Sequence, residues 1–295
     1  MLTLMGLSAT AYAQNTGNAK ASKIYVRAGG TYAFPQAGQM TMQSGQFMNG
    51  NLKGVTTMNG TVSNTTYNWD LKKASLGAGV TGIVAGGYMF NKNVGIEVAA
   101  SIGISPKKYE FVETDVYPSQ GIQITDQMKT KVYQKGSVLI MPSVVIQSGG
   151  NKLNVYSRIG LAIPVAGKTM VEMESYGFIT QASILTSWAY EVKNRFALGL
   201  QGALGAQYSL SSKIRLYVEA NGVSLSANAK TGTMTHFTQN GTNYLEDVNV
   251  SDREIKYELS GTTTSTVDNN QPSTMPSFTS TFNNIGVGAG LVFQL

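Results

Sequence analysis

The sequence predicts an all-β fold, an eight-stranded antiparallel up-and-down transmembrane β-barrel with three short periplasmic turns and four long extracellular loops. Three observations predict it. Eight segments alternate large apolar residues with small or polar ones, which is the period of a β-strand. Short and long connections alternate strictly along the chain. The face without aliphatic residues carries few charges, whereas a water-exposed face is typically about a quarter to a third charged.

The predicted strands are separated by hairpin-turn residues or by long polar stretches. The strands are Lys23–Phe34, Ser75–Phe90, Val94–Ser105, Ser137–Gln147, Lys152–Val165, Arg195–Leu210, Lys213–Ala227 and Asn284–Phe293. The short links are Asn91–Asn93, Ser148–Asn151 and Ser211–Ser212, which are typical of hairpins. The long links are 36–74, 106–136, 166–194 and 228–283. Because the number of strands is even, both chain ends are expected beside the short turns.

The second strand contains Gly77, Gly79 and Gly82, a G-x-G-x-x-G pattern that also occurs in dinucleotide-binding turns. Such a turn needs a helix after the last glycine, because the phosphates bind at the helix N-terminus. Here the next residues are IVAGGY, which are poor helix formers. We therefore interpret the stretch as a strand, with Gly77 and Gly79 facing the bore, Gly82 facing lipid, and no cofactor bound.

The later strands show the same alternation in chain order. In the third, VGIEVAASI, large aliphatic residues alternate with Gly, Glu, Ala and Ser. The sixth, FALGLQGALGAQYSL, alternates Phe and Leu with Gly, Ala and Gln. The seventh, IRLYVEAN, alternates aliphatic residues with Arg, Tyr, Glu and Asn. The eighth, IGVGAGLVF, alternates aliphatic residues with glycine.

Small side chains suit the narrow bore of an eight-stranded barrel, so we expect the large aliphatic residues to face lipid. The opposite orientation, with an apolar interior, would describe a soluble lipocalin-like carrier. Aromatic residues near the strand ends favour the membrane orientation, because they resemble the two interfacial girdles of a membrane barrel. They are Tyr32, Phe34, Tyr88, Phe90, Phe196, Tyr208 and Phe293.

Composition narrows the function classes. Charged residues make up 13% of the 295 residues, and no cysteine is present, which excludes disulfides, thiolate catalysis and cysteine-based zinc sites. The net charge of +6 is not gathered in a basic run, so nucleic acid is not an expected partner.

An apolar start ending in Ala11-Tyr12-Ala13 predicts a signal peptide over residues 1–13. No Lys or Arg precedes it, so we expect the true start to lie upstream. Residues 14–22 are then a periplasmic leader and residues 23–295 the barrel domain.

These features together resemble the small OmpA/OmpX-type outer-membrane β-barrel proteins of Gram-negative bacteria. The resemblance covers the mature chain and includes the ending IGVGAGLVFQL, which is similar to the C-terminal strand signal read by the barrel-insertion machinery. Relatives mostly end in an aromatic residue; here Phe293 lies two positions before the terminal Leu295. The resemblance implies a location in the cell outer membrane, with outer-membrane lipid and the insertion machinery as partners.

The odd or even position of each residue along its strand, which we call its parity, decides the face on which it lies. Parity also predicts a set of lumenal charges near the short-turn end of the barrel. The set is Arg27, Glu97, Arg158, Arg215 and Glu219. Because unpaired buried charge is costly, opposite signs should meet, and Tyr25, Tyr156 and Tyr217 should satisfy them further. The cluster could be a plug that fixes the barrel. It could instead be a polar constriction that admits small solutes or ions.

No catalytic, cofactor-binding or metal-binding residue is assigned. Glu97 and Glu219 could form a glycosidase-like carboxylate pair, but a narrow bore excludes the sugar that such a pair would cleave. The single histidine, His236, lies in a long loop with no partner spacing for a metal.

We expect a non-enzymatic structural or surface-interaction barrel whose long, methionine-containing loops meet an extracellular ligand or host surface. The run KKYEFVETDVY should be a strand extension above the membrane. The alternatives are a narrow porin-like channel and, more distantly, an outer-membrane enzyme or a soluble carrier.

Overall fold

The computed structural model describes most of the chain after residue 73 and a smaller part before it. The described residues are 23–36, 48–49, 54–55, 57–59, 62–64, 70–71, 74–119, 122–179, 182–260 and 268–295. The predicted signal peptide and periplasmic leader lie outside them, as does most of the first long loop. No helix within these ranges is long and apolar enough to cross a membrane.

The predicted fold class is confirmed, because eight antiparallel strands close into a barrel. These strands are β1 (Ile24–Pro35), β7 (Gly79–Met89), β8 (Val94–Pro106), β10 (Ile122–Gln147), β11 (Leu153–Ile179), β13 (Gly199–Ser209), β14 (Ile214–Ser224) and β20 (Asn284–Gln294). Each pairs with the next along this series. β20 also pairs with β1, from Tyr25↔Gln294 to Pro35↔Asn284, which closes the ring. Closure leaves no unpaired strand edge facing lipid.

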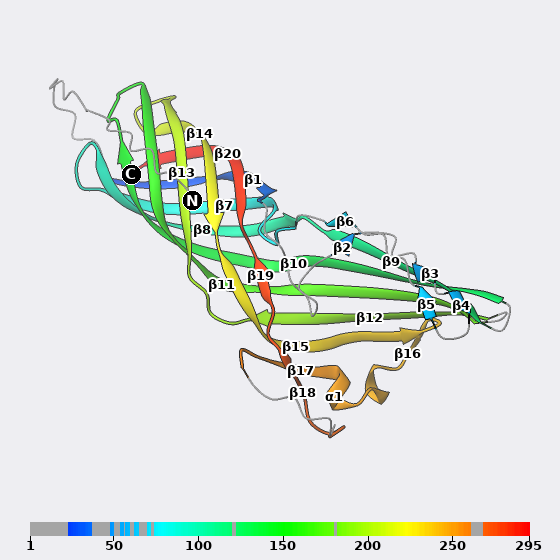
Figure 1. The fold of residues 1–295 in the computed structure, drawn as a ribbon. Coiled ribbons are helices and arrows are strands. Elements are labelled where there is room, and N and C mark those ends of the chain that lie inside the picture. The colour runs from blue at the N-terminus through cyan, green and yellow to red at the C-terminus, as the bar shows by residue number, and fades with distance from the viewer. Residues whose placement is uncertain are drawn as a thin grey trace.

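Two barrel strands continue far beyond the barrel. β10 has 26 residues and β11 has 27, and they remain paired with each other over nearly their whole length. Beyond the barrel they are joined by β9 (Tyr109–Ser119), β12 (Ala182–Asn194), β15 (Ser226–Gln239), β17 (Glu254–Glu258) and β18 (Ser273–Pro276). We call this sheet the extension. It runs away from the barrel as one long, curved layer (Figure 1).

Several short elements complete the described chain. They are β2 (Met48–Asn49), β3 (Gly54–Val55), β4 (Thr57–Asn59), β5 (Val62–Asn64), β6 (Asp70–Leu71), β16 (Thr242–Asn243), the 3-10 turn η1 (Leu245–Asp247), the helix α1 (Val250–Arg253) and β19 (Thr279–Thr281). β19 pairs with the start of β15, so it connects the extension to the mouth of the barrel.

A bulge marks the point at which the barrel becomes the extension. β10 pairs with β8 from Val138 onward and with β9 up to Val132, and its register with β11 shifts between Lys135 and Val138. Gly136 and Gly167 have φ values of 63° and 129° there, which favour glycine. Such bulges bend strands and increase their twist, so the sheet can leave the barrel wall here.

The predicted outward and inward faces of the barrel strands are confirmed. Large aliphatic side chains point outward, for example Leu204 at 68% exposure, whereas Ala85 and Ala99 inside are at most 3% exposed. The seven aromatic residues predicted for the girdles are all exposed, from 37% for Phe293 to 79% for Phe196. Tyr88, Phe90, Tyr208 and Phe293 lie at the short-turn end and Tyr32, Phe34 and Phe196 at the other.

The start of the second strand was predicted wrongly. β7 begins at Gly79 rather than Ser75, and Leu76 and Ala78 are 3% and 4% exposed instead of facing lipid. The preceding segment folds across the barrel mouth, where the Leu76 amide donates to the Thr281 carbonyl over 2.9 Å. Gly77 therefore does not face the bore from a strand. Gly79 makes the corner with a φ of 124°.

The later long connections differ from simple loops as well. The stretch 106–136 is largely the β9–β10 hairpin, and KKYEFVETDVY forms most of β9, as predicted. The stretch 166–194 is the β11–β12 hairpin. The sixth strand begins at Gly199 rather than Arg195, and the seventh ends at Ser224 because Ser226 already starts β15.

Candidate functional site in the barrel lumen

Four of the five predicted lumenal charges come together. Arg27 on β1, Glu97 on β8, Arg158 on β11 and Glu219 on β14 have side chains that are at most 5% exposed. They point inward because they share the parity of the small lumenal residues on their strands. We call these four residues the quartet.

Each arginine of the quartet contacts both glutamates. Arg27 Nη2 lies 2.8 Å from Glu97 Oε1, and Arg27 Nη1 lies 3.6 Å from Glu219 Oε2. Arg158 Nη1 lies 2.5 Å from Glu97 Oε1, and Arg158 Nη2 contacts Glu219 Oε2. The result is a ring of alternating charge with no net charge, which lowers the energy of holding four ions away from water.

Tyrosines complete the coordination of the two carboxylates. The Tyr25 hydroxyl donates to Glu97 Oε2 over 3.0 Å, and the Tyr156 hydroxyl donates to Glu219 Oε2 over 2.6 Å. Tyr217 contributes its ring face, whose centroid lies 5.0 Å from the Arg27 guanidinium carbon. Buried charges need such additional partners, because a pair alone does not replace full hydration.

Glycines on neighbouring strands make room for these three rings. Tyr25 lies opposite Gly87, Tyr156 opposite Gly205 and Tyr217 opposite Gly290. A Cβ on Gly87 would lie 2.1 Å from the Tyr25 ring, one on Gly205 2.6 Å from the Tyr156 ring, and one on Gly290 2.7 Å from the Tyr217 ring. The alternation of glycine with large residues therefore reflects packing of lumenal tyrosines. Sequence reasoning missed this pairing, because it depends on strand register.

Arg215 stands apart from the quartet. It is partly exposed and lines a small cavity of about 10 Å³ on the short-turn side, together with Tyr25 and Gln294. No ion pair of Arg215 occurs among the described residues. The two charged residues of the stretch IRLYVE are therefore separated. Glu219 belongs to the quartet, and Arg215 lies nearer the short-turn end.

A second cavity, of about 70 Å³, lies on the other side of the quartet. Arg27, Arg158 and Glu219 line its floor, and Thr31, Gln201 and Asn221 are among its polar wall residues. Leu76 and Phe282 line it as well. A space of this size accommodates several water molecules.

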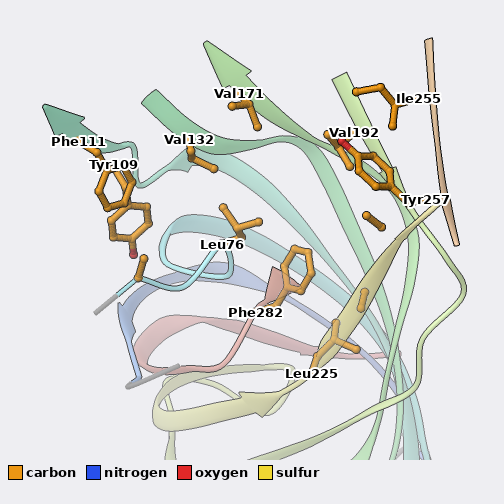
Figure 2. Close-up of a cluster of buried hydrophobic side chains, with 13 residues drawn as sticks. Leu76, Tyr109, Phe111, Val132, Val171, Val192, Leu225, Ile255, Tyr257 and Phe282 are labelled. Carbon is orange, nitrogen blue, oxygen red and sulfur yellow. The ribbon is translucent and has the colours of Figure 1, made fainter. Parts of the chain in front are cut away.

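An apolar cluster closes the mouth above this cavity, and the sequence did not predict it. Figure 2 shows Leu76, Phe282 and Leu225 enclosed by the strands of the extension. The other large members are Tyr109, Phe111, Val132, Val171, Val192, Ile255 and Tyr257. The Tyr109 hydroxyl bonds both the amide and the carbonyl of Ser75, at 3.1 and 3.0 Å, which fixes the segment that carries Leu76. We call this set the mouth cluster.

The remaining candidates for chemistry were the two lumenal glutamates and the single histidine. Glu97 and Glu219 are both bound by arginines, so neither stands as a free carboxylate in the bore. His236 lies on β15, is exposed, and has Nε2 3.4 Å from Thr238 Oγ1. Within the described ranges, no group of three or more His, Cys, Asp or Glu residues could hold a metal ion.

A closed antiparallel barrel with an aliphatic outer face, aromatic girdles and a polar lumen defines an integral outer-membrane β-barrel protein. The family model described as "outer membrane protein beta-barrel domain" matches residues 1–245, and the chain belongs to this family. The family assignment confirms the resemblance to OmpA/OmpX-type barrels. A comparison with curated proteins found no match.

Proposed function

We propose that the protein is a closed, non-enzymatic barrel that anchors the extension at the cell surface, where the extension binds an extracellular ligand or host surface. Outer-membrane lipid surrounds the barrel, and the barrel-insertion machinery recognises its last strand. The observation that carries the proposal is the continuity of β10 and β11 from the barrel into the extension.

The length of these strands supports a role outside the membrane. A transmembrane β-strand needs roughly 9–11 residues. β10 and β11 have 26 and 27, so more than half of each strand is not required to cross the bilayer. Strand extensions of this length hold a surface at a fixed distance and orientation from the membrane.

Partly buried apolar residues on the inner face of the extension support recognition. Met173 lies opposite Trp188, and Trp188 lies opposite Phe237, so the three side chains share one cross-strand row beyond the mouth cluster. All three are partly buried. Aromatic residues and methionine are common at adaptable binding surfaces.

Two barriers support a closed bore. The quartet joins four strands across the lumen near the short-turn end, and the mouth cluster covers the opposite end. A solute would have to break buried ion pairs and displace apolar side chains in turn.

Conductance and surface binding test the two parts of the proposal. The purified full chain in a planar lipid bilayer should give no stable open steps. Cells that display the chain should bind to panels of glycans, matrix proteins or host cells. A variant with residues 113–128 and 172–189 each replaced by a two-residue Asn-Gly turn should lose this binding, because it removes Met173 and Trp188. The new turns join the paired residues Val112–Lys129 and Val171–Tyr190. Both chains should keep heat-modifiable gel mobility, the mark of a folded barrel. Equal binding by the two would reject the recognition role.

A narrow channel for small solutes or ions is the second candidate. The observation in its favour is that cavities of about 70 and 10 Å³ flank the quartet on its two sides. Stable open steps from the wild-type chain would favour the channel over the closed anchor.

A further inference from the structure

Six lysines lie on the outer face where the barrel passes into the extension. Each comes from a different strand or strand junction of the sheet. They are Lys108, Lys135, Lys168, Lys193, Lys230 and Lys256. We call them the lysine row.

Strand register brings these lysines together. Lys135 lies opposite Lys168. Thr169 lies opposite Val192, so Lys168 and Lys193 are adjacent on the next pair of strands. Thr231 lies opposite both Lys193 and Lys256, which continues the row onto β17.

The two remaining lysines join the row through local geometry. Lys230 is the extra residue where the β12–β15 register shifts, because Lys193 pairs with Thr231 and Asn194 with Ala229. The Lys108 ammonium lies 4.7 Å from the centroid of the Tyr133 ring, which places it on the same face at the start of β9.

The lysine row faces outward, on the lipid-facing side of the wall. Gln134, Thr169 and Val192 alternate with row members and are at most 5% exposed, so they point inward. Lys108, Lys135, Lys193, Lys230 and Lys256 are exposed, and the Lys168 side chain is 43% exposed.

The row begins where the apolar outer band ends. Along β11 the outward residues from Val155 to Val165 are mainly aliphatic, and Lys168 follows after Gly167. Ten residue steps from Val155 to Val165 cover about 33 Å, at roughly 3.3 Å a step. At a strand tilt of about 40° this is about 25 Å of membrane, the usual height of the apolar band. The Lys168 ammonium therefore lies at the level of the lipid headgroups, and the row crosses the neighbouring strands from there.

Few carboxylates neutralise the row. Glu191 contacts Lys168, and Glu254 lies two residues from Lys256 on β17, opposite Thr233. Glu258, also two residues from Lys256, pairs with Arg195 at 3.2 Å, and Glu110 and Glu172 both lie opposite Lys131, which is outside the row. The row keeps an excess of positive charge beside the bilayer.

We propose that the lysine row binds the phosphate groups of anionic glycolipids in the outer leaflet. Lysines placed at a membrane surface attract anionic headgroups, and each contributes to the affinity. The six side chains lie side by side along the wall, so one or more multiply phosphorylated headgroups can contact several of them at once. Binding would hold the base of the extension against the membrane surface.

Native mass spectrometry of the full chain in zwitterionic detergent tests this proposal. The chain is titrated with bis-phosphorylated lipid A or with the same lipid lacking its phosphates. The row variant carries Lys135→Gln, Lys193→Gln and Lys256→Gln, and it leaves the Lys168–Glu191 contact intact. The matched control carries Lys92→Gln, Lys152→Gln and Lys213→Gln, the same charge change at exposed positions beside the short turns.

We expect wild type and control to bind the phosphorylated lipid at least about tenfold more tightly than the dephosphorylated one. The row variant should lose most of this preference while keeping heat-modifiable mobility. A wild-type chain without the preference, or equal losses in the two variants, would overturn the proposal. Displacement of the lipid by millimolar inorganic phosphate would also overturn it, because the site would then recognise free phosphate rather than a lipid.

Discussion

Arg27 and Glu97 form a two-point ion pair across the intervening strand β7, with an Nη2–Oε1 distance of 2.8 Å and an Nε–Oε2 distance of 3.3 Å. Neither side chain is more than 2% exposed. The pair belongs to a ring in which both partners have further contacts, so removing either group leaves a buried charge without its partner.

Glu97→Gln should therefore destabilise the barrel strongly. The change leaves two arginines with one glutamate, and breaking a buried pair typically costs about 3–5 kcal/mol. The free energy of unfolding in urea, measured in lipid vesicles, checks this. Glu258→Gln is the control, because it removes an exposed pair with Arg195 and should cost no more than about 1 kcal/mol. Equal losses for the two variants would contradict the assignment of the quartet as buried.

Tyr25→Phe should lower stability by about 1.5–3 kcal/mol, the usual contribution of a hydrogen bond to a charged group. The change removes the hydroxyl that donates to Glu97 Oε2 over 3.0 Å and leaves the ring in place. The same unfolding measurement applies. Tyr32→Phe, at a half-exposed girdle position, should change stability by less than about 0.5 kcal/mol. If Tyr25→Phe is equally mild, the hydroxyl does not support the glutamate.

Gly29→Ala and Gly86→Ala should behave in opposite ways. A Cβ on Gly29 would lie 2.2 Å from Tyr217 Oη and 2.4 Å from the Ala289 carbonyl oxygen. A Cβ on Gly86 would meet nothing within 4 Å. Overpacking typically costs about 1–3 kcal/mol, so Gly29→Ala should unfold at lower urea concentration. Gly86→Ala should be neutral or slightly stabilising, and a reversed order would refute the lumenal packing of Tyr217.

Phe282→Ala should destabilise the mouth cluster by about 3–5 kcal/mol, because it empties a buried aromatic site. Leu204→Ala removes a side chain that is 68% exposed on the outer face and serves as the control. Hydrogen exchange should show faster opening around Ser75 and Tyr109 in Phe282→Ala only. Unchanged exchange there would mean that Phe282 does not hold the mouth segment.

Tyr190 should titrate late in the alkaline range. Burial, followed by the charges of Tyr257 and Asp252, raises the pKa of Tyr190 from 10.0 to about 12. The folded state holds this proton more tightly than the unfolded state. The stabilisation is therefore complete below pH 10 and is lost as the pH rises from 10 to 12. Absorbance at 295 nm should show that Tyr190→Phe removes one transition near pH 12, and removal of one near pH 10 would contradict the burial.

The sequence by itself determined the number and order of the eight barrel strands, the faces of their central residues and the class of fold. These properties follow from the period of two along each strand and from the alternation of short and long links, both of which are local. For the same reason parity alone assigned Arg27, Glu97, Arg158 and Glu219 to the lumen, where the structure places them together. It also assigned Arg215 to the lumen. Parity does not specify how far along the barrel axis a side chain lies, and Arg215 lies nearer the short-turn end.

Tertiary structure decided which residues meet. Ion-pair partners, the tyrosine–glycine contacts and the lysine row all depend on strand stagger, which no single strand encodes. Leu76 follows the parity of a lipid-facing residue, yet it is buried because Phe282 and Leu225 reach the same place from the far end of the chain. The extension likewise arises because β10 and β11 exchange their barrel neighbours for β9 and β12 at a bulge. Local pattern fixes the direction in which each side chain points, and only closure of the barrel fixes the partner that it finds.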